Sequence, residues 1–155
     1  MTDEVLLERL RELYANRDTT NFGVMDLLHA VGSPLEALMY ARLFWPEFVE
    51  MEGMVFLKET VEDEDDRQRF WEAYETHRRD RRRTEESLNL IEVTRLFGAR
   101  GNESSPAEDR CLADRLATMW RARLATIYPD RSFVVDVVQV DPSDPDEIGI
   151  VFYQR

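Results

Sequence analysis

The stretch from Ser132 to Val140 (SFVVDVVQV) constrains the fold of this 155-residue chain more than any other. It is rich in β-branched residues, which favour extended backbone, and few polar residues interrupt it. We therefore expect a strand that is buried over much of both faces. Asp141 to Asp146 (DPSDPD) is typical of a turn, and Ile148 to Tyr153 of a returning strand. Strands with so short a connection pair antiparallel, which predicts a C-terminal hairpin at about residues 131–153.

A second hairpin is predicted in the middle of the chain. In EFVEMEGMVFLK (Glu47 to Lys58) two apolar runs flank Glu52-Gly53. This pattern predicts that Phe48–Met51 pairs with Met54–Leu57 across a tight turn.

Most of the remaining chain has apolar residues at helical spacing. Caps and breakers place four helices: one beginning near Thr2 or Asp3, one over Val24–Val31, one from a Ser33 cap to Pro46, and one from Ser105 to before Pro129. The last begins with Ser105-Pro106-Ala107-Glu108, a capping box that has proline at the first helical position.

Two more helices are predicted between the hairpins. Asp63 can cap a long helix from about Glu64 to Arg83, and Leu88 to Phe97 fits a helix capped by Thr84. Gly98 to Ser105 (GARGNESS) has the composition of a loop. No repeat or long linker divides the chain. We therefore expect a single α+β domain over residues 1–155, in which several helices pack against a small antiparallel sheet made from the two hairpins.

The predicted long helix is strongly polarised in charge. Acids from Glu62 to Asp66 lie at its start, and five arginines lie at its end: Arg78, Arg79, Arg81, Arg82 and Arg83. The helix dipole favours both placements. The arginines are also a candidate anion-binding patch. Asp80 interrupts them, acids follow them, and no nucleic-acid motif accompanies them, so we interpret them first as a solvated helix end.

Composition argues against several classes of partner. The formal net charge of -12 disfavours nucleic acids and anionic membranes, whose binding depends on cationic side chains. The N-terminus lacks the pattern of a signal peptide, and no apolar run approaches the ~20 residues that span a bilayer. Cys111 is the single cysteine, which excludes an internal disulfide. We expect a cytoplasmic protein.

No sequence motif indicates catalysis. His29 and His77 lie outside any metal-binding spacing, and Cys111 has no neighbouring base in the sequence. No nucleophile elbow or phosphate-binding loop occurs. We therefore predict no catalytic residue, metal or cofactor, although thirty-two acids leave room for a carboxylate pair that forms only in the folded protein.

The expected function is that of a small acidic interaction module, of the immunity or inhibitor type, that binds a basic protein. Its predicted binding residues are the acids around the start of the long helix: Glu59, Glu62, Asp63, Glu64, Asp65 and Asp66. One alternative is an enzyme with a cleft between helices and sheet, lined by Trp45, Phe48, Trp71, His77 and Trp120. Another is a self-associating subunit that forms a homodimer through a strand edge.

Overall fold

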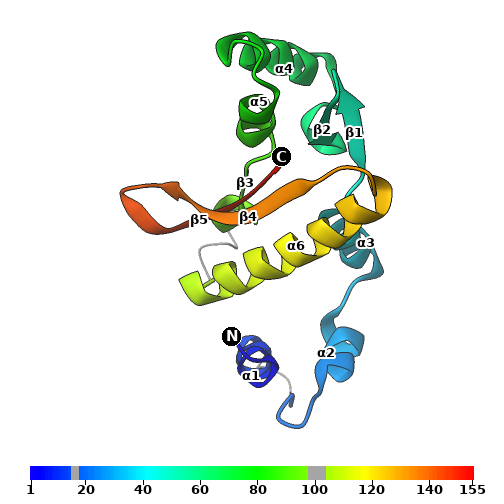
Figure 1. Ribbon diagram of the computed structural model, residues 1–155. Helices are drawn as coiled ribbons and strands as arrows, with labels where there is room; N and C mark the ends of the chain where they lie inside the picture. The colour runs from blue at the N-terminus through cyan, green and yellow to red at the C-terminus, as the bar shows by residue number, and fades with distance from the viewer. Residues whose placement is uncertain (15–17, 98–103) are drawn as a thin grey trace. The chain divides into compact units, whose positions relative to one another are not determined.

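The computed structural model describes residues 1–14, 18–97 and 104–155. The chain is an α+β protein, as predicted, and the described part contains six α-helices and two small antiparallel sheets (Figure 1). It forms two compact units, Met1–Arg42 and Leu43–Arg155. A single domain over residues 1–155 stays a prediction.

The first unit is helical. It contains α1 (Asp3–Leu13), α2 (Val24–Val31) and most of α3 (Pro34–Phe44). The predicted caps are present: the hydroxyls of Thr2 and Ser33 accept the backbone N–H groups of Val5 and Glu36, at 3.4 Å each. The burial of this unit is low. No residue of α1 or α3 is buried, and Leu27 is the one buried residue of α2.

Both predicted hairpins are confirmed in the second unit. β1 (Phe48–Met51) pairs with β2 (Met54–Leu57) in the expected register. The turn between them has positive φ at Glu52 (52°) and Gly53 (77°), as a two-residue hairpin turn requires. β4 (Phe133–Asp141) pairs antiparallel with β5 (Asp144–Gln154).

The two hairpins lie in separate sheets, which differs from the single sheet that we expected. β1 and β2 form a two-stranded sheet, and a short strand β3 (Ile91–Glu92) joins the other to give the order β3-β5-β4. The prediction that the strand from Ser132 to Val140 is buried over much of both faces is wrong, because β5 and not β4 takes the central position. Ile148–Phe152 of β5 is buried throughout, whereas β4 is an edge strand with an exposed Asp136.

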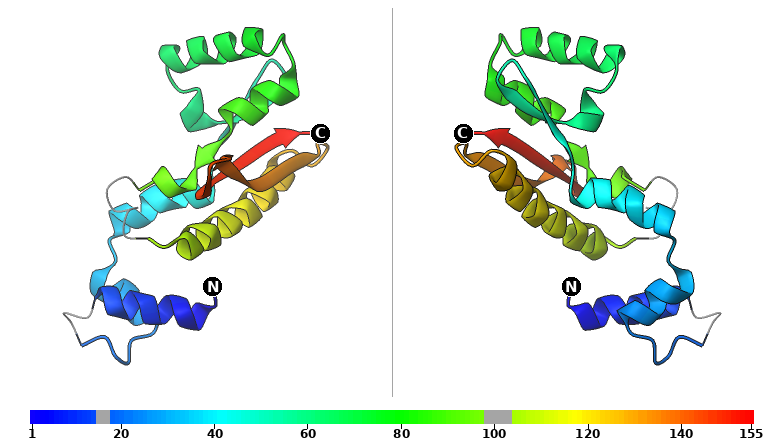
Figure 2. Two further views of the ribbon diagram at one scale, coloured as in Figure 1. Left: turned by 90° about the vertical axis from the view of Figure 1, so that its left-hand side faces the viewer. Right: turned by 90° about the vertical axis from the view of Figure 1, so that its right-hand side faces the viewer.

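Helix α6 (Pro106–Ile127) packs along β4 and β5 (Figure 2). Its predicted capping box is present: the Glu108 carboxylate accepts the Ser105 N–H at 2.6 Å, and the Ser105 hydroxyl accepts the Glu108 N–H at 3.3 Å. The indole of Trp120 is 1% exposed and donates to the Leu43 carbonyl at 2.8 Å. This helix supplies one side of the main core, and Phe152 and Ile150 supply the other.

The predicted long helix 64–83 is wrong at its C-terminal end. The chain instead forms α4 (Glu64–Thr76) and α5 (Arg81–Leu88), because Arg78 and Arg79 adopt left-handed φ values of 56° and 62°. Asp80 then caps α5 by accepting the Arg83 N–H at 3.1 Å. The break lets α5 run in a new direction and present its own buried side to the strands.

The predicted helix 88–97 is also wrong. Asn89 ends α5, β3 follows, and a short 3-10 turn spans Val93–Arg95. Thr84 does not cap a helix, because it lies buried inside α5 with its hydroxyl donating to the Asp80 carbonyl at 2.8 Å. Most of the predicted loop from Gly98 to Ser105 lies outside the described residues.

Two buried side chains, one in α5 and one at its C-cap, join the two sheets. The Glu85 carboxylate is 1% exposed and accepts the backbone N–H groups of Val55 in β2 and Gln154 in β5, each at 2.7 Å. One turn later, the Asn89 amide donates to the carbonyls of Val55 (2.8 Å) and Phe152 (3.2 Å). These two side chains therefore satisfy backbone groups of two strands that do not pair with each other.

Candidate functional site

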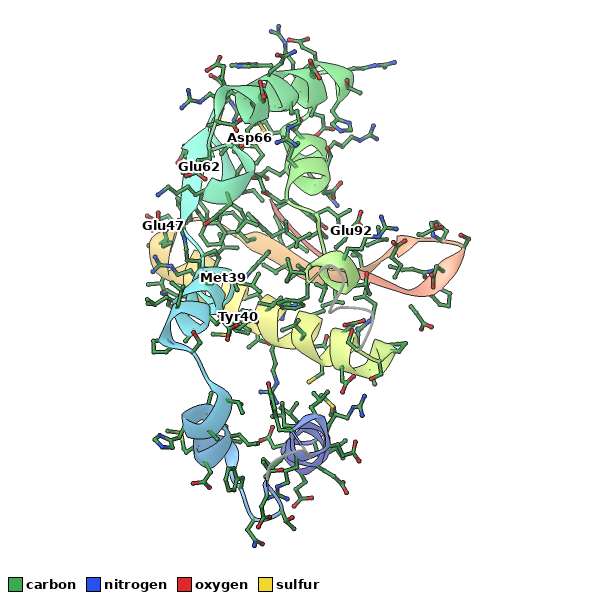
Figure 3. The ribbon with its side chains drawn as sticks, turned by 180° about the vertical axis from the view of Figure 1, so that it is seen from behind. Met39, Tyr40, Glu47, Glu62, Asp66 and Glu92 are labelled. Carbon is green, nitrogen blue, oxygen red and sulfur yellow. The ribbon has the colours of Figure 1, made fainter. Side chains whose placement is uncertain are left out.

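The six acids predicted to bind a partner divide into two groups in the structure. Asp63 and Asp66 form the capping box of α4. Asp66 is labelled at the start of this helix in Figure 3. The Asp66 carboxylate is 7% exposed and accepts the N–H groups of Glu62 (2.9 Å) and Asp63 (3.3 Å), and Arg69 contacts it. The hydrogen bond from Asp63, with help from Arg69 and Glu62, holds the pKa of Asp66 below its usual value. Asp63 and Asp66 are thus committed to the helix start.

The other acids of this group face the solvent. Glu59, Glu62, Glu64 and Asp65 are all exposed. The Glu64 side chain is 89% exposed, and the Arg67 guanidinium lies 3.5 Å from its carboxylate. An exposed pair at this distance contributes little to stability, so the carboxylate remains accessible to a second cation.

Trp71 lies two helical turns after Glu64 and therefore on the same side of α4. Its indole is 47% exposed. Its ring makes an edge contact with the buried Phe70, at 4.9 Å between centroids, and a tilted contact with Tyr74 at 6.1 Å. These contacts hold the ring in place while much of it stays in water.

Further exposed carboxylates lie along α4. The exposed side of α4 continues through Gln68, Glu72 and Glu75. The Gln68 amide donates to Glu72 at 2.8 Å, and Arg79 pairs with Glu75 at 2.8 Å. We define the α4 outer surface as Glu62, Glu64, Asp65, Trp71, Glu72 and Glu75. It is a mainly acidic surface with one large aromatic side chain, and Arg67, four residues before Trp71, lies on the same side of the helix.

The arginine tract does not form one basic patch at the end of a helix. Arg78 and Arg79 lie in the connection between α4 and α5, and the other three arginines form the first turn of α5. Carboxylates pair with much of the tract. Glu75 accepts from Arg79 and raises its pKa, Glu86 accepts from Arg82 at 3.0 Å, and Asp80 lies 3.7 Å from Arg83.

The aromatic residues of the alternative cleft are spread over several environments. Phe48 and Trp120 both pack on Phe152, with ring centroids 5.3 and 6.0 Å apart, inside the main core. Trp71 belongs to the smaller cluster around Phe70, and His77 ends α4. Trp45 is 45% exposed and lies 5.2 Å below the Arg123 guanidinium.

A shallow hollow of about 310 Å³ lies on the face of the β4–β5 hairpin opposite the core. Its lining is Glu86, Leu90, Asp136, Val138, Val151 and Tyr153. Arg82 lies next to it, 4.6 Å over the Tyr153 ring and paired with Glu86. The hollow contains none of the predicted site residues.

Among the described residues, no group of three or more histidine, cysteine or acidic side chains is arranged to hold a metal ion. His29 is exposed on α2, and Cys111 is half-buried on α6. The described helices include none that is long and apolar enough to cross a membrane. No family model, no curated protein and no solved structure matches the chain.

Proposed function

We propose that this protein is an interaction module that binds a basic protein partner through the α4 outer surface. The observation that carries the proposal is the indole of Trp71, which is 47% exposed on α4. Helical spacing places Glu64, seven residues before it, and Glu75, four residues after it, on the same side of the helix. Tryptophan is among the residues that most often dominate binding energy at protein interfaces. A half-exposed, well-supported indole needs little reordering when it binds, which lowers the entropic cost of association.

The charges around Trp71 favour a partner that presents arginine or lysine. Glu62, Glu64 and Asp65 precede the indole, and Glu72 and Glu75 follow it. A guanidinium can stack on the indole face while its N–H groups donate to a neighbouring carboxylate. The formal charge of -12 adds long-range attraction, which accelerates the encounter with a basic protein.

The structure narrows the set of acids that we propose for binding. Asp63 and Asp66 hold the start of α4, so replacing them would disturb the helix as well as the surface. Glu64, Asp65 and Trp71 can be changed without removing a described hydrogen bond of the core. They are therefore the residues on which to test the proposal.

The test is a pull-down from native lysate, treated with nuclease, with four versions of the protein. Wild type is compared with Trp71→Ala, with the double reversal Glu64→Lys and Asp65→Lys, and with a control double reversal on α1, Glu4→Lys and Glu8→Lys. The control changes the net charge by the same amount at two exposed acids of another helix, of which Glu4 lies in the first turn, as Glu64 and Asp65 do in α4.

We expect one basic protein to be recovered by wild type and by the α1 control, and to be lost or strongly reduced with both α4 variants. The association rate of the purified pair should fall as salt rises, since the attraction is screened. Equal recovery by all four versions, or recovery that disappears with nuclease, contradicts the proposal.

A further inference from the structure

Helix α3 has no polar side that could face water. Its 11 residues, PLEALMYARLF, contain two charged side chains, Glu36 and Arg42. A helix that is apolar nearly all round is normally buried on all sides. Leu43 and Phe44, at its C-terminal end, pack against the main core of the second unit. Nevertheless, no residue of the helix is buried.

Both α3 and the helix that precedes it, α2, expose apolar side chains, and only two residues separate the two helices in the chain. Leu35 is 78% exposed, Leu38 67% and Met39 58%; Met39 is marked on α3 in Figure 3. The α2 members are Val24, Met25 and Leu28, which are 53%, 75% and 57% exposed. We call these six side chains the α2–α3 apolar surface. Scattered apolar side chains are normal on a protein surface, but six large ones within sixteen residues mark an interaction site.

We propose that the α2–α3 apolar surface is a two-fold interface with a second copy of this chain. The first argument is area. Fully burying one such side chain removes roughly 60–120 Å² of apolar surface, so these six, about two-thirds exposed, supply roughly 350 Å² per copy. A specific interface at the small end of the standard range buries roughly 600 Å² per partner, of which somewhat more than half is apolar. The apolar area that each copy offers is therefore about the apolar area that such an interface buries.

The second argument is charge and symmetry. A two-fold interface brings the same surface of each copy together, and an apolar surface is complementary to itself. Its apolar side chains offer no carboxylate to the basic partner proposed for α4, and the two binding events therefore use different chemistry on different helices. Two copies of a chain with charge -12 repel each other, so this contact must rest on apolar burial.

This reasoning predicts opposite responses to salt at the two surfaces. Salt screens the repulsion between copies and strengthens apolar burial, so it should tighten the dimer. Salt should weaken the binding of a basic partner at α4. The two proposals can therefore fail separately. If the protein dimerises but binds no basic partner, the proposed function fails and the dimer stands. If it binds a basic partner but stays monomeric, the dimer fails and the proposed function stands.

The experiment is sedimentation equilibrium of the full chain at concentrations from about 1 to 200 µM, because mass action populates a weak dimer only at the upper end. We expect the mass to rise from 18.3 kDa towards twice that value, with a dissociation constant in the micromolar range that decreases as sodium chloride is added. A wild type that stays monomeric throughout overturns the proposal, since α3 would then be covered within one chain or remain exposed.

Two variants locate the interface. Leu38→Gln with Met39→Gln should weaken dimerisation at least tenfold, and its far-UV circular dichroism should be unchanged because neither side chain is buried. Trp71→Ala removes an apolar side chain that is 47% exposed on another helix and should leave the dimer intact. Oxidative cross-linking of Leu38→Cys, in a Cys111→Ser background, gives a second readout that does not depend on mass. A dimer that survives the double glutamine change, or is lost with Trp71→Ala, overturns the assignment.

Discussion

Helices α3 and α6 show how differently two helices of one chain can use their apolar residues. α6 has charged residues along its exposed side and buries five residues: Ala113, Leu116, Ala117, Trp120 and Leu124. α3 is apolar nearly all round and buries none. Apolar spacing thus predicts that a helix forms, but its burial depends on whether another surface covers it. The four predictions below test this contrast, from the largest expected effect to the smallest.

The largest effect is expected in the core beneath α6. Trp120→Ala removes an indole that is 1% exposed and packs edge-on against Phe152. It should lower the free energy of unfolding by about 3–5 kcal/mol, through lost burial and the cavity left behind. Urea unfolding followed by circular dichroism measures this. Trp71→Ala is the matched control and should cost less than about 1 kcal/mol, because surface substitutions rarely cost more. Similar losses in the free energy of unfolding for Trp120→Ala and Trp71→Ala would contradict the contrast between a covered and an uncovered apolar side chain.

An effect of comparable size is expected at the junction between the sheets. Glu85→Ala leaves the N–H groups of Val55 and Gln154 without their described acceptor. At about 1–3 kcal/mol for each buried unpaired group, the free energy of unfolding should fall by about 2–6 kcal/mol. Glu85→Gln keeps one acceptor oxygen and should lose less.

The neighbouring Glu86 provides the control for that prediction. Its carboxylate pairs with Arg82 at the surface, so Glu86→Ala should cost about 0–1 kcal/mol. Thermal unfolding of all three variants gives the comparison. If Glu85→Ala is no more destabilising than Glu86→Ala, the bridge between β2 and β5 contributes little.

A smaller effect is expected from pH at the start of α4. The pKa of Asp66 is lowered in the folded protein, mainly by the hydrogen bond from the Asp63 N–H. The stability that it contributes is therefore present above its unfolded pKa, near 3.8, and is lost as the pH falls through the lower folded pKa. Asp66→Asn should have a lower free energy of unfolding than wild type at neutral pH. Between pH 4 and about pH 2, its free energy of unfolding should fall less than that of wild type, because the carboxylate that titrates is gone. Asp65→Asn, at an exposed neighbour, should follow wild type.

The smallest effect is expected on α3. Leu35→Ala and Leu38→Ala remove side chains that are 78% and 67% exposed. At concentrations where the chain is monomeric, each should change the free energy of unfolding by no more than about 0.5 kcal/mol. At high concentration the same changes should lower the melting temperature, because they remove stabilisation by dimerisation. A large loss in the monomer would mean that α3 is covered within one chain.

Local features were the ones that sequence reasoning predicted well. The cap at Asp63, the capping box at Ser105, the Glu52-Gly53 turn and both hairpins are confirmed. Each depends on residues within a few positions of one another. The break between α4 and α5 had a local signal too: Asp80, within the arginine tract, is an N-cap. We interpreted it only as an interruption of positive charge, and the left-handed pair Arg78-Arg79 before it had no glycine to reveal it.

The candidate site was predictable in part. The acids at the start of α4 were evident from the sequence, but two of them, Asp63 and Asp66, serve the helix itself. The exposure of Trp71 was not predictable, because Trp71 and Trp120 both follow helical spacing while one is 47% and the other 1% exposed.

The sequence by itself determined the α+β class, the helix caps and the strand pairs, since hydrogen bonds and backbone preferences between near neighbours specify them. The tertiary structure decided the division into two sheets, the central place of β5 and the bridging role of Glu85. Those features join residues that are distant in the chain: the Glu85 carboxylate meets Val55 and Gln154, 30 and 69 positions away. Such contacts form only after the chain has closed long loops, and no local pattern of residues encodes which distant groups will meet.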